Sequence, residues 1–243
     1  MVFFSALDLK DKERGVALLP DIPLRDGVRS LNMSDWEERV DKVIAFSKGC
    51  DVLLPQSFKT EVNFLLDHTI LIPVSGLQKK QKIQDLFFID KGDQGLTEAA
   101  IYNYINTSNG FPVYGGGSGV PKFKAGKDLK KLSGDAATLF EGPALVVSMD
   151  GSSGFIQVIE QGCFYCNHHG AVLKPKDTGT SLWCFAQLAE SALKRLASNK
   201  EGSATLTKPA LENFCVRFPK DPTVTEKISK RRKELTALSR LTQ

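Results

Sequence analysis

The chain has 243 residues, of which 42% are hydrophobic and 25% charged, a balance that excludes pervasive disorder, collagen and coiled-coil rods. No apolar run approaches the roughly 18 residues that a transmembrane helix needs, and the N-terminal segment lacks the basic start of a signal peptide. Five cysteines, an odd number, argue against a disulfide scaffold and favour a reducing compartment. We therefore expect a cytoplasmic protein, with no membrane partner, that has one large domain or two small ones.

The net charge of +4 is concentrated in two segments. Residues 217–243 hold eight Lys and Arg against three Asp and Glu, and residues 122–131 hold five lysines against one aspartate. A clustered basic excess is the electrostatic footprint of a polyanion ligand. Solvated surfaces would have the same composition, so the two clusters alone leave both interpretations open.

The first third of the chain contains one predicted helix and several short strands. Residues 34–48 open with a capping box, Ser34 and Glu37, and carry an apolar stripe that is typical of an amphipathic helix. Apolar runs bounded by Pro, Gly and charges predict strands at 52–55, 62–66 and 69–74. Residues 77–85 are polar and charged, so we expect a domain boundary there and no contribution to a core.

The central third is the most β-like part of the chain. Apolar runs between turn residues predict strands at 86–90, 144–149, 154–160 and 164–175. The segment Asp150–Gly154 between two of them has the composition of a hairpin turn. A helical turn is predicted at 97–105 with Thr97 as its cap, and a strand from 111 leads into a glycine-rich loop, residues 114–119, called here the glycine loop.

The last third changes to helices. Residues 181–197 predict a buried amphipathic helix capped by Ser181, and 213–219 predict one more strand. The final twenty residues predict a helix with a thin apolar stripe at Val224, Ile228, Leu235 and Leu238. The fold class is therefore α+β, with a β-rich domain, flanking helices and a C-terminal amphipathic helix. We expect an N-terminal α/β region at 1–80, without an assigned role, the β-rich domain at 81–222 and the C-terminal helix at 223–243.

Two motifs suggest chemistry, but each lacks a component that the chemistry needs. Pro121 follows the glycine loop, which has neither the Lys-Ser/Thr ending of a P-loop nor the helix of a dinucleotide fingerprint. Cys163, Cys166, His168 and His169 crowd into seven residues, and in one strand they would alternate between faces and could not converge on zinc. Cys166 and His168 lack a third, orienting group. We expect no metal, no cofactor and no catalytic residue.

Nucleic-acid binding has more support from the residue types. Five lysines follow the glycine loop directly, and nearby side chains are of the kinds that stack on bases or reach base edges. These side chains are Tyr114, Tyr165, Asn167, His168 and His169. A lysine-rich surface loop beside buried aromatic residues would give the same pattern, so the residues alone do not decide between the two.

Six motifs follow one another in the second two thirds of the chain. They are LFFIDKG at 86–92, LT at 96–97, FPVYGGG at 111–117, ALVVSMDGSSGFIQVI at 144–159, FYCNHHGAVLKPK at 164–176 and CVRFPKD at 215–221. In this order they resemble the target recognition domain of type I restriction–modification specificity subunits and related type II subunits. The chain departs from that family in carrying one such domain where specificity subunits usually carry two, and in lacking the glutamine after its last motif.

The resemblance implies a half-size specificity subunit that directs partner methyltransferase or nuclease subunits to a double-stranded DNA target and does no chemistry itself. The alternatives are a stand-alone type II restriction endonuclease with its nuclease in residues 1–80, and an interaction module that does not bind DNA. The single domain also implies that the helix at 223–243 binds a second copy, as a homodimer, or a methyltransferase subunit. Its basic residues Lys230, Arg231, Arg232 and Lys233 would then face DNA or an acidic partner.

The same resemblance divides the candidate DNA-binding residues into two groups. Phosphate anchoring is expected from the lysine segment, which comprises Lys122, Lys124, Lys127, Lys130 and Lys131. Base readout is expected from the loops, through Tyr114, Gly116, Ser118, Ser152, Ser153, Asn167 and either His168 or His169.

Overall fold

The computed structural model describes residues 3–8, 16–21, 70–72, 76–106, 108–117, 121–198 and 205–241. The chain divides into two compact units, one formed by 1–78 with 219–221 and the other by 79–218 with 222–243. The predicted helix at 34–48 and the predicted strands at 52–55 and 62–66 lie outside the described residues. Within the described residues, no helix is long and apolar enough to span a bilayer.

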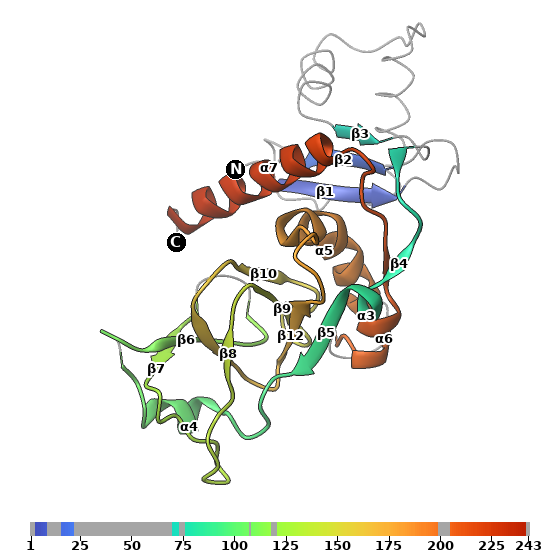
Figure 1. Ribbon diagram of the computed structural model, residues 1–243. Coiled ribbons are helices and arrows are strands. Elements are labelled where there is room, and N and C mark those ends of the chain that lie inside the picture. Colours follow the sequence, from blue (N-terminus) through green and yellow to red (C-terminus); the bar gives the residue numbers. More distant parts are fainter. Residues whose placement is uncertain are drawn as a thin grey trace, which may run out of the picture. The chain divides into compact units, whose positions relative to one another are not determined.

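The smaller unit contains a three-stranded antiparallel sheet in the order β1-β2-β3 (Figure 1). Its strands are β1 (Phe3–Asp8), β2 (Val16–Asp21) and β3 (Ile70–Ile72). The third strand confirms the strand predicted at 69–74. The antiparallel pair of β1 and β2 was not predicted, because the N-terminal apolar patch was considered only as a possible targeting signal.

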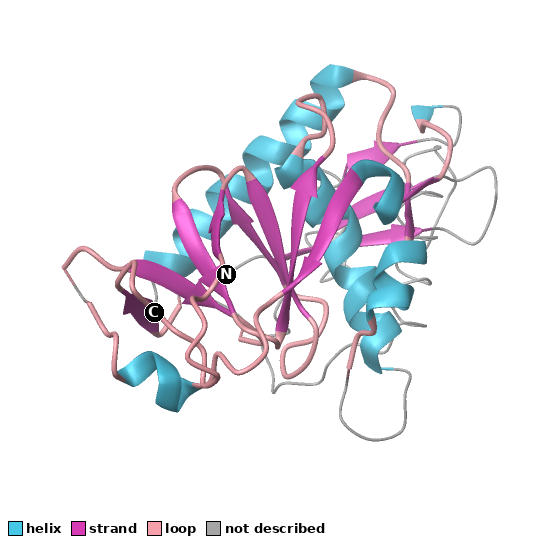
Figure 2. Ribbon diagram, turned by 60° about the horizontal axis from the view of Figure 1, so that its bottom comes forward, coloured by secondary structure: helices cyan, strands magenta, loops and turns pink. Residues whose placement is uncertain are grey.

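The first sheet of the larger unit is antiparallel throughout and has the order β10-β9-β12-β5. Its strands are β5 (Phe87–Lys91), β9 (Ala144–Ser148), β10 (Ile156–Ile159) and β12 (Gly170–Pro175). Every residue of β9 and β10 is buried. Helix α5 (Leu182–Ser198) packs on β10, and its Phe185 ring meets the Phe87 ring edge-on with centroids 4.9 Å apart. The strands are magenta in Figure 2.

The second sheet has the order β7-β6-β11-β8 and contains one parallel pair, β6 with β11. Its strands are β6 (Phe111–Tyr114), β7 (Phe123–Ala125), β8 (Leu139–Glu141) and β11 (Cys163–Cys166). A buried cluster that includes Phe140, Val146, Phe164 and Val172 joins strands of both sheets. A second cluster includes Ile101 of helix α4 (Glu98–Tyr102), whose N-terminus Thr97 caps as predicted.

Residues 77–85, predicted to be a polar bridge without core residues, contribute to both units. Leu77 and Ile83 are 4% and 0% exposed, so that prediction is wrong. The polar residues between them are exposed, but Ile83 opens a short helix, α3 (Ile83–Leu86), and its backbone N–H donates to the carbonyl of Phe214 at 2.9 Å. Strand β4 (Gln81–Lys82) pairs with β13 (Cys215–Val216).

The C-terminal part agrees with the predicted helices but not with the predicted strand. Ser181 caps α5 as expected, by accepting the backbone N–H of Cys184 at 3.3 Å. The strand predicted at 213–219 is reduced to β13, and an unpredicted helix, α6 (Lys208–Asn213), precedes it. Thr207 caps α6 and Pro209 lies in its first turn, which is a helix-start signal that sequence reasoning overlooked.

The predicted terminal helix is α7 (Pro222–Leu241), and it packs on α5. Ile228 is 1% exposed, and the Arg232 guanidinium donates to the carboxylate of Glu190 in α5 at 2.5 Å. Lys233 forms an ion pair with Glu160 at 2.7 Å. The expectation that Arg232 faces DNA or a partner is therefore wrong, because a carboxylate of its own domain holds it.

Candidate nucleic-acid interface

A tight turn, Asn167–His169, separates β11 from β12. The prediction of one continuous strand over 164–175 is therefore wrong, and so is the placement of His168 and His169 on opposite strand faces. The N–H of Gly170 donates to the carbonyl of Asn167 at 3.0 Å, and the two imidazole centroids are only 3.8 Å apart. A Cβ on Gly170 would lie 2.7 Å from the Cys166 sulfur, so glycine permits this close return of the chain.

The glycine loop is fixed by hydrogen bonds to two other loops. The N–H of Asn167 donates to the carbonyl of Tyr114 at 2.9 Å, which attaches the Asn167–His169 turn. The N–H of Ser152 donates to the carbonyl of Gly116 at 2.8 Å, which attaches the β9–β10 turn. These two bonds bring together three segments that are distant in sequence.

Glycine is required at two positions of this loop by the space around it. A Cβ on Gly115 would lie 2.2 Å from Oδ1 of Asn167, and a Cβ on Gly116 would lie 2.6 Å from the backbone oxygen of Asp150. Cβ atoms do not approach other heavy atoms this closely, so any side chain at Gly116 would push the loop away from the turn that holds Asp150.

A pocket of about 420 Å³ opens where these three loops meet. Four side chains predicted from the sequence line it together with the backbone of Gly116, and they are Tyr114, Lys122, Asn167 and His169. Its other walls, which the sequence analysis did not predict, include Glu98, Ile101, Phe123 and Asp150. The pocket therefore combines apolar walls with both hydrogen-bond donors and acceptors.

His169 is held in this pocket by two contacts. Its Nδ1 lies 2.6 Å from Oδ1 of Asp150, and its backbone N–H donates to Oδ1 of Asn167 at 3.1 Å. The adjacent His168 differs, because its Nδ1 is buried and has no hydrogen-bond partner among the described residues. Burial, followed by the neighbouring His169, lowers the pKa of His168 from its ordinary value of 6.5, which favours the uncharged ring.

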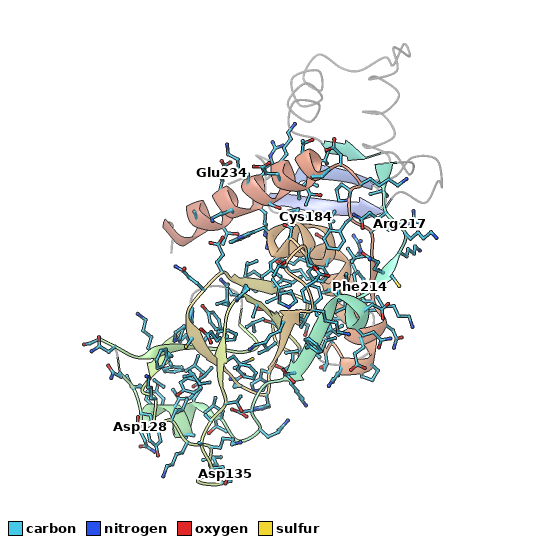
Figure 3. The ribbon with its side chains drawn as sticks, viewed as in Figure 1. Asp128, Asp135, Cys184, Phe214, Arg217 and Glu234 are labelled. Atoms are coloured by element: carbon cyan, nitrogen blue, oxygen red, sulfur yellow. The ribbon has the colours of Figure 1, made fainter. Side chains whose placement is uncertain are left out.

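The lysine segment begins at Lys122, just before the edge strand β7, and continues through Lys124 of that strand into the turn that follows it. Leu129 is 1% exposed and anchors the turn, while Lys124, Lys127 and Lys130 are exposed. Lys131 differs from the others because its ammonium lies 3.6 Å from the carboxylate of Asp93. Figure 3 places Asp128 and Asp135 of this region at the opposite end of the larger unit from Arg217 and Glu234.

The remaining predicted residues have different positions. Ser153 is 6% exposed and its hydroxyl donates to the carbonyl of Met149, so the prediction that it contacts bases is wrong. Tyr165 is fully buried, and its hydroxyl donates to the carbonyl of Gly126 at 2.9 Å, so it cannot reach a base either. Ser152 is half-buried beside the glycine loop. Ser118 lies outside the described residues.

Cys166, at the end of β11 beside this site, is not a reactive thiolate. Burial raises the pKa of Cys166 to about 12, so its sulfur stays protonated at neutral pH and is a poor nucleophile and metal ligand. Within the described part of the chain, no three His, Cys, Asp or Glu side chains are grouped so that they could hold a metal ion.

The fold and this site define an α+β domain in which loops of two sheets surround a pocket beside exposed lysines. The family model for the type I restriction modification DNA specificity domain matches residues 77–243. The chain therefore belongs to this family, as the order of its sequence motifs predicted.

Similar solved structures include an S subunit of a type I restriction-modification system from M. genitalium, which is 16% identical with a TM-score of 0.47. The match covers 64% of this chain and 37% of that one. The HsdS subunit from Thermoanaerobacter tengcongensis is 17% identical with a TM-score of 0.45, over 69% of this chain and 40% of that one.

A third structure, described as the structural basis of complex assembly and conformational transition of the type I R-M system, is 15% identical with a TM-score of 0.46. The match covers 85% of this chain and 48% of that one. The chain thus spans less than half the length of each of these three structures. A search of curated protein sequences finds no significant match.

Proposed function

We propose that this chain recognises a DNA sequence on behalf of partner methyltransferase or nuclease subunits and does no chemistry itself. The observation that carries the proposal is the shared pocket of Tyr114, Lys122, Asn167 and His169 in a chain of the DNA specificity family. In this proposal residues 81–222 are the DNA target recognition domain. The alternative of a stand-alone endonuclease is not favoured, because the family that matches is a specificity domain.

The described residues divide into two groups by exposure and charge. Lys124, Lys127 and Lys130 are exposed and carry no base-specific geometry, so they anchor DNA phosphates on any sequence. The side chains of Asn167 and His169 offer hydrogen-bond donors and acceptors in a fixed orientation, which base readout requires. In this proposal sequence choice resides in the Asn167–His169 turn.

The experiment that tests this function is selection from a randomised duplex library by the purified full chain. We expect one short sequence to be enriched, and an Asn167→Ala variant to relax one position of that sequence while retaining affinity for random DNA. Each base contact contributes discrimination of about 1–3 kcal/mol, which such a selection resolves. A chain that binds no DNA at low salt, alone or with methyltransferase subunits, contradicts the proposal.

We also propose that the C-terminal half of α7 binds a second copy of the chain or a methyltransferase subunit. Support comes from the length of α7, 20 residues, because the helix continues for about two turns beyond Arg232, which pairs with Glu190 of α5. Truncation after Lys233 retains the buried Ile228 and the ion pair of Arg232 with Glu190. We expect the truncated chain to keep its melting temperature and to lose self-association or partner binding in size-exclusion chromatography. Unchanged assembly after this truncation contradicts the proposal.

A further inference from the structure

The carbonyl groups of Tyr114, Gly115, Gly116 and Gly117 all accept hydrogen bonds from the body of the domain. Ser148, which is 2% exposed, shares its one hydroxyl proton between the carbonyls of Gly115 and Gly117, each at 3.1 Å. The carbonyl of Gly116, between them, accepts the N–H of Ser152. The loop therefore rests on a buried serine, and its oxygen atoms face inward.

This arrangement determines where the amide hydrogens of the loop point. In a planar trans peptide the N–H lies opposite the C=O of the same unit. The N–H of Gly116 belongs to the peptide whose carbonyl is bonded to Ser148, and the N–H of Gly117 to the peptide whose carbonyl is bonded to Ser152. Both N–H groups therefore point away from these partners, and within the described residues neither donates to any acceptor.

Adjacent backbone N–H groups that point the same way form a concave site for an anion. Here a cation is close, because Lys122 lines the same pocket as Gly116 and Gly117. Two carboxylates also line the pocket. Asp150 is paired with His169 at 2.6 Å. Glu98 on α4 would repel an anion in the pocket, so its removal should strengthen anion binding where removal of Lys122 should weaken it.

We infer that the glycine loop is a phosphate-binding site, in which the N–H groups of Gly116 and Gly117 and the ammonium of Lys122 bind one phosphate group. The inference rests on the proposed function in taking that phosphate from the DNA backbone. It assigns the loop a role other than base readout, because a phosphate contact carries no sequence information. Ser148 is then a positioning residue that holds the loop carbonyls inward.

The first arm of the test measures affinity for a randomised duplex of about 30 base pairs as a function of salt. The Gly116→Ala variant places a Cβ against the Asp150 backbone. Gly179→Ala is its matched control, since Gly179 lies in an exposed turn outside the site and a Cβ there would lie near Oδ1 of Asp177 alone, at 3.3 Å. We expect Gly116→Ala to bind roughly tenfold more weakly and Gly179→Ala to bind like the unmodified chain, because hydrogen bonds to charged groups contribute about this much.

Two charge variants keep the test independent of loop folding. Lys122→Gln should lower the slope of log K against log salt by about 0.9, the value for one phosphate contact. Glu98→Gln should strengthen binding, because it removes an opposing charge. Neither variant should change which sequences a library selection enriches. A changed sequence preference in Gly116→Ala or Lys122→Gln would show that the loop reads bases, and this overturns the inference.

The second arm uses inorganic phosphate alone and does not require DNA binding. In chain labelled with ¹⁵N-glycine, phosphate should shift the amide signals of Gly116 and Gly117, with smaller shifts in Lys122→Gln. If phosphate shifts these amide signals but the full chain does not bind DNA, the proposed function is contradicted. The loop is then a site for free phosphate. DNA binding that is equal in Gly116→Ala and Gly179→Ala overturns the loop site and leaves the proposed function intact. Absence of both signals overturns both.

Discussion

Two strands of the first sheet of the larger unit, β9 and β10, differ from three strands of its second sheet, β6, β7 and β8, in how much of each strand is buried. In β9 and β10 every residue is buried, because both faces of that sheet are covered, by α5 and by the cluster that joins the sheets. In β6, β7 and β8 only one residue of each strand is buried, namely Val113, Ala125 and Phe140. Strands β9 and β10 are therefore part of a scaffold, whereas β6, β7 and β8 present side chains to solvent. Substitutions in the scaffold strands should therefore lower the stability of the fold, whereas substitutions on the exposed strands should weaken DNA binding without lowering stability.

The largest expected effect lies in the scaffold. Phe185 of α5 is fully buried, with its ring 4.9 Å from that of Phe87 and 6.4 Å from that of Phe218. Phe185→Ala should lower the free energy of unfolding by about 3–5 kcal/mol, because it leaves a cavity, and chemical denaturation measures this. DNA affinity of the folded fraction should not change. Leu132→Ala, at a side chain that is 66% exposed, is the control and should leave stability unaltered.

The second largest effect is expected from the lysine segment on and beside β7, and it concerns DNA binding alone. A triple Lys→Ala variant at Lys122, Lys124 and Lys127 should lower the salt slope of DNA binding by about 2.7 and weaken binding on all sequences alike. Its denaturation midpoint should match that of the unmodified chain, because all three of these lysines are exposed and none is part of a buried cluster. Lys208→Ala on α6 is the control. Unchanged DNA affinity in the triple variant would contradict a role of the segment in DNA binding. Its lysines would then serve only to prevent aggregation at the edge strand.

A smaller effect is expected where α5 meets α7. The Glu190 carboxylate bonds Arg232 and Lys194 and also accepts the backbone N–H of Ile156 at 3.2 Å. Glu190→Gln should lower the free energy of unfolding by about 1–3 kcal/mol, because it leaves the largely buried guanidinium without its counter-charge. Glu212→Gln removes only an exposed pair with Lys208 and should cost much less. Equal losses in the two variants would show that the α5–α7 contact does not depend on this ion pair.

The smallest expected effect is a dependence on pH. The pKa of His168 is lowered in the folded chain, by burial and then by His169, so the unfolded chain takes up this proton first as the pH falls. The contribution of His168 is therefore constant above about pH 6.5 and becomes destabilising below it. We expect the free energy of unfolding of His168→Gln to fall less between about pH 7 and 5 than that of the unmodified chain. A larger fall in the variant would contradict a lowered pKa of His168 in the folded chain.

Local signals were sufficient for much of the scaffold. Thr97 and Ser181 cap helices as their sequence context predicted, and Asp150–Gly154 forms the predicted turn because its composition permits little else. The turn at Asn167–His169 was missed because the only glycine in that stretch, Gly170, follows it, so the apolar flanks resemble one strand. Its conformation depends on contacts from elsewhere in the chain, such as the hydrogen bond to Tyr114.

The candidate site could be predicted in composition but not in arrangement. Lys122, Asn167 and His169 were identified by residue type, yet their common pocket depends on the fold. Ser148 has no sequence signal, since a serine in an apolar strand does not reveal that its hydroxyl supports a loop more than thirty positions away. The burial of Ser153 and the pairing of Arg232 with Glu190 likewise come from tertiary packing, which periodicity does not encode.

The parallel pairing of β6 with β11 also has a consequence for the order of folding. The hairpin of β9 and β10 closes across a short turn, but Val113 and Tyr165 pair across about fifty residues of intervening chain. Non-local pairing is slow, because the entropy of closing a long loop is lost before the contacts form. The pocket exists only once this pairing has brought Tyr114 beside Asn167. During refolding, the ability to bind a ligand should therefore appear after the hairpin and most of its secondary structure.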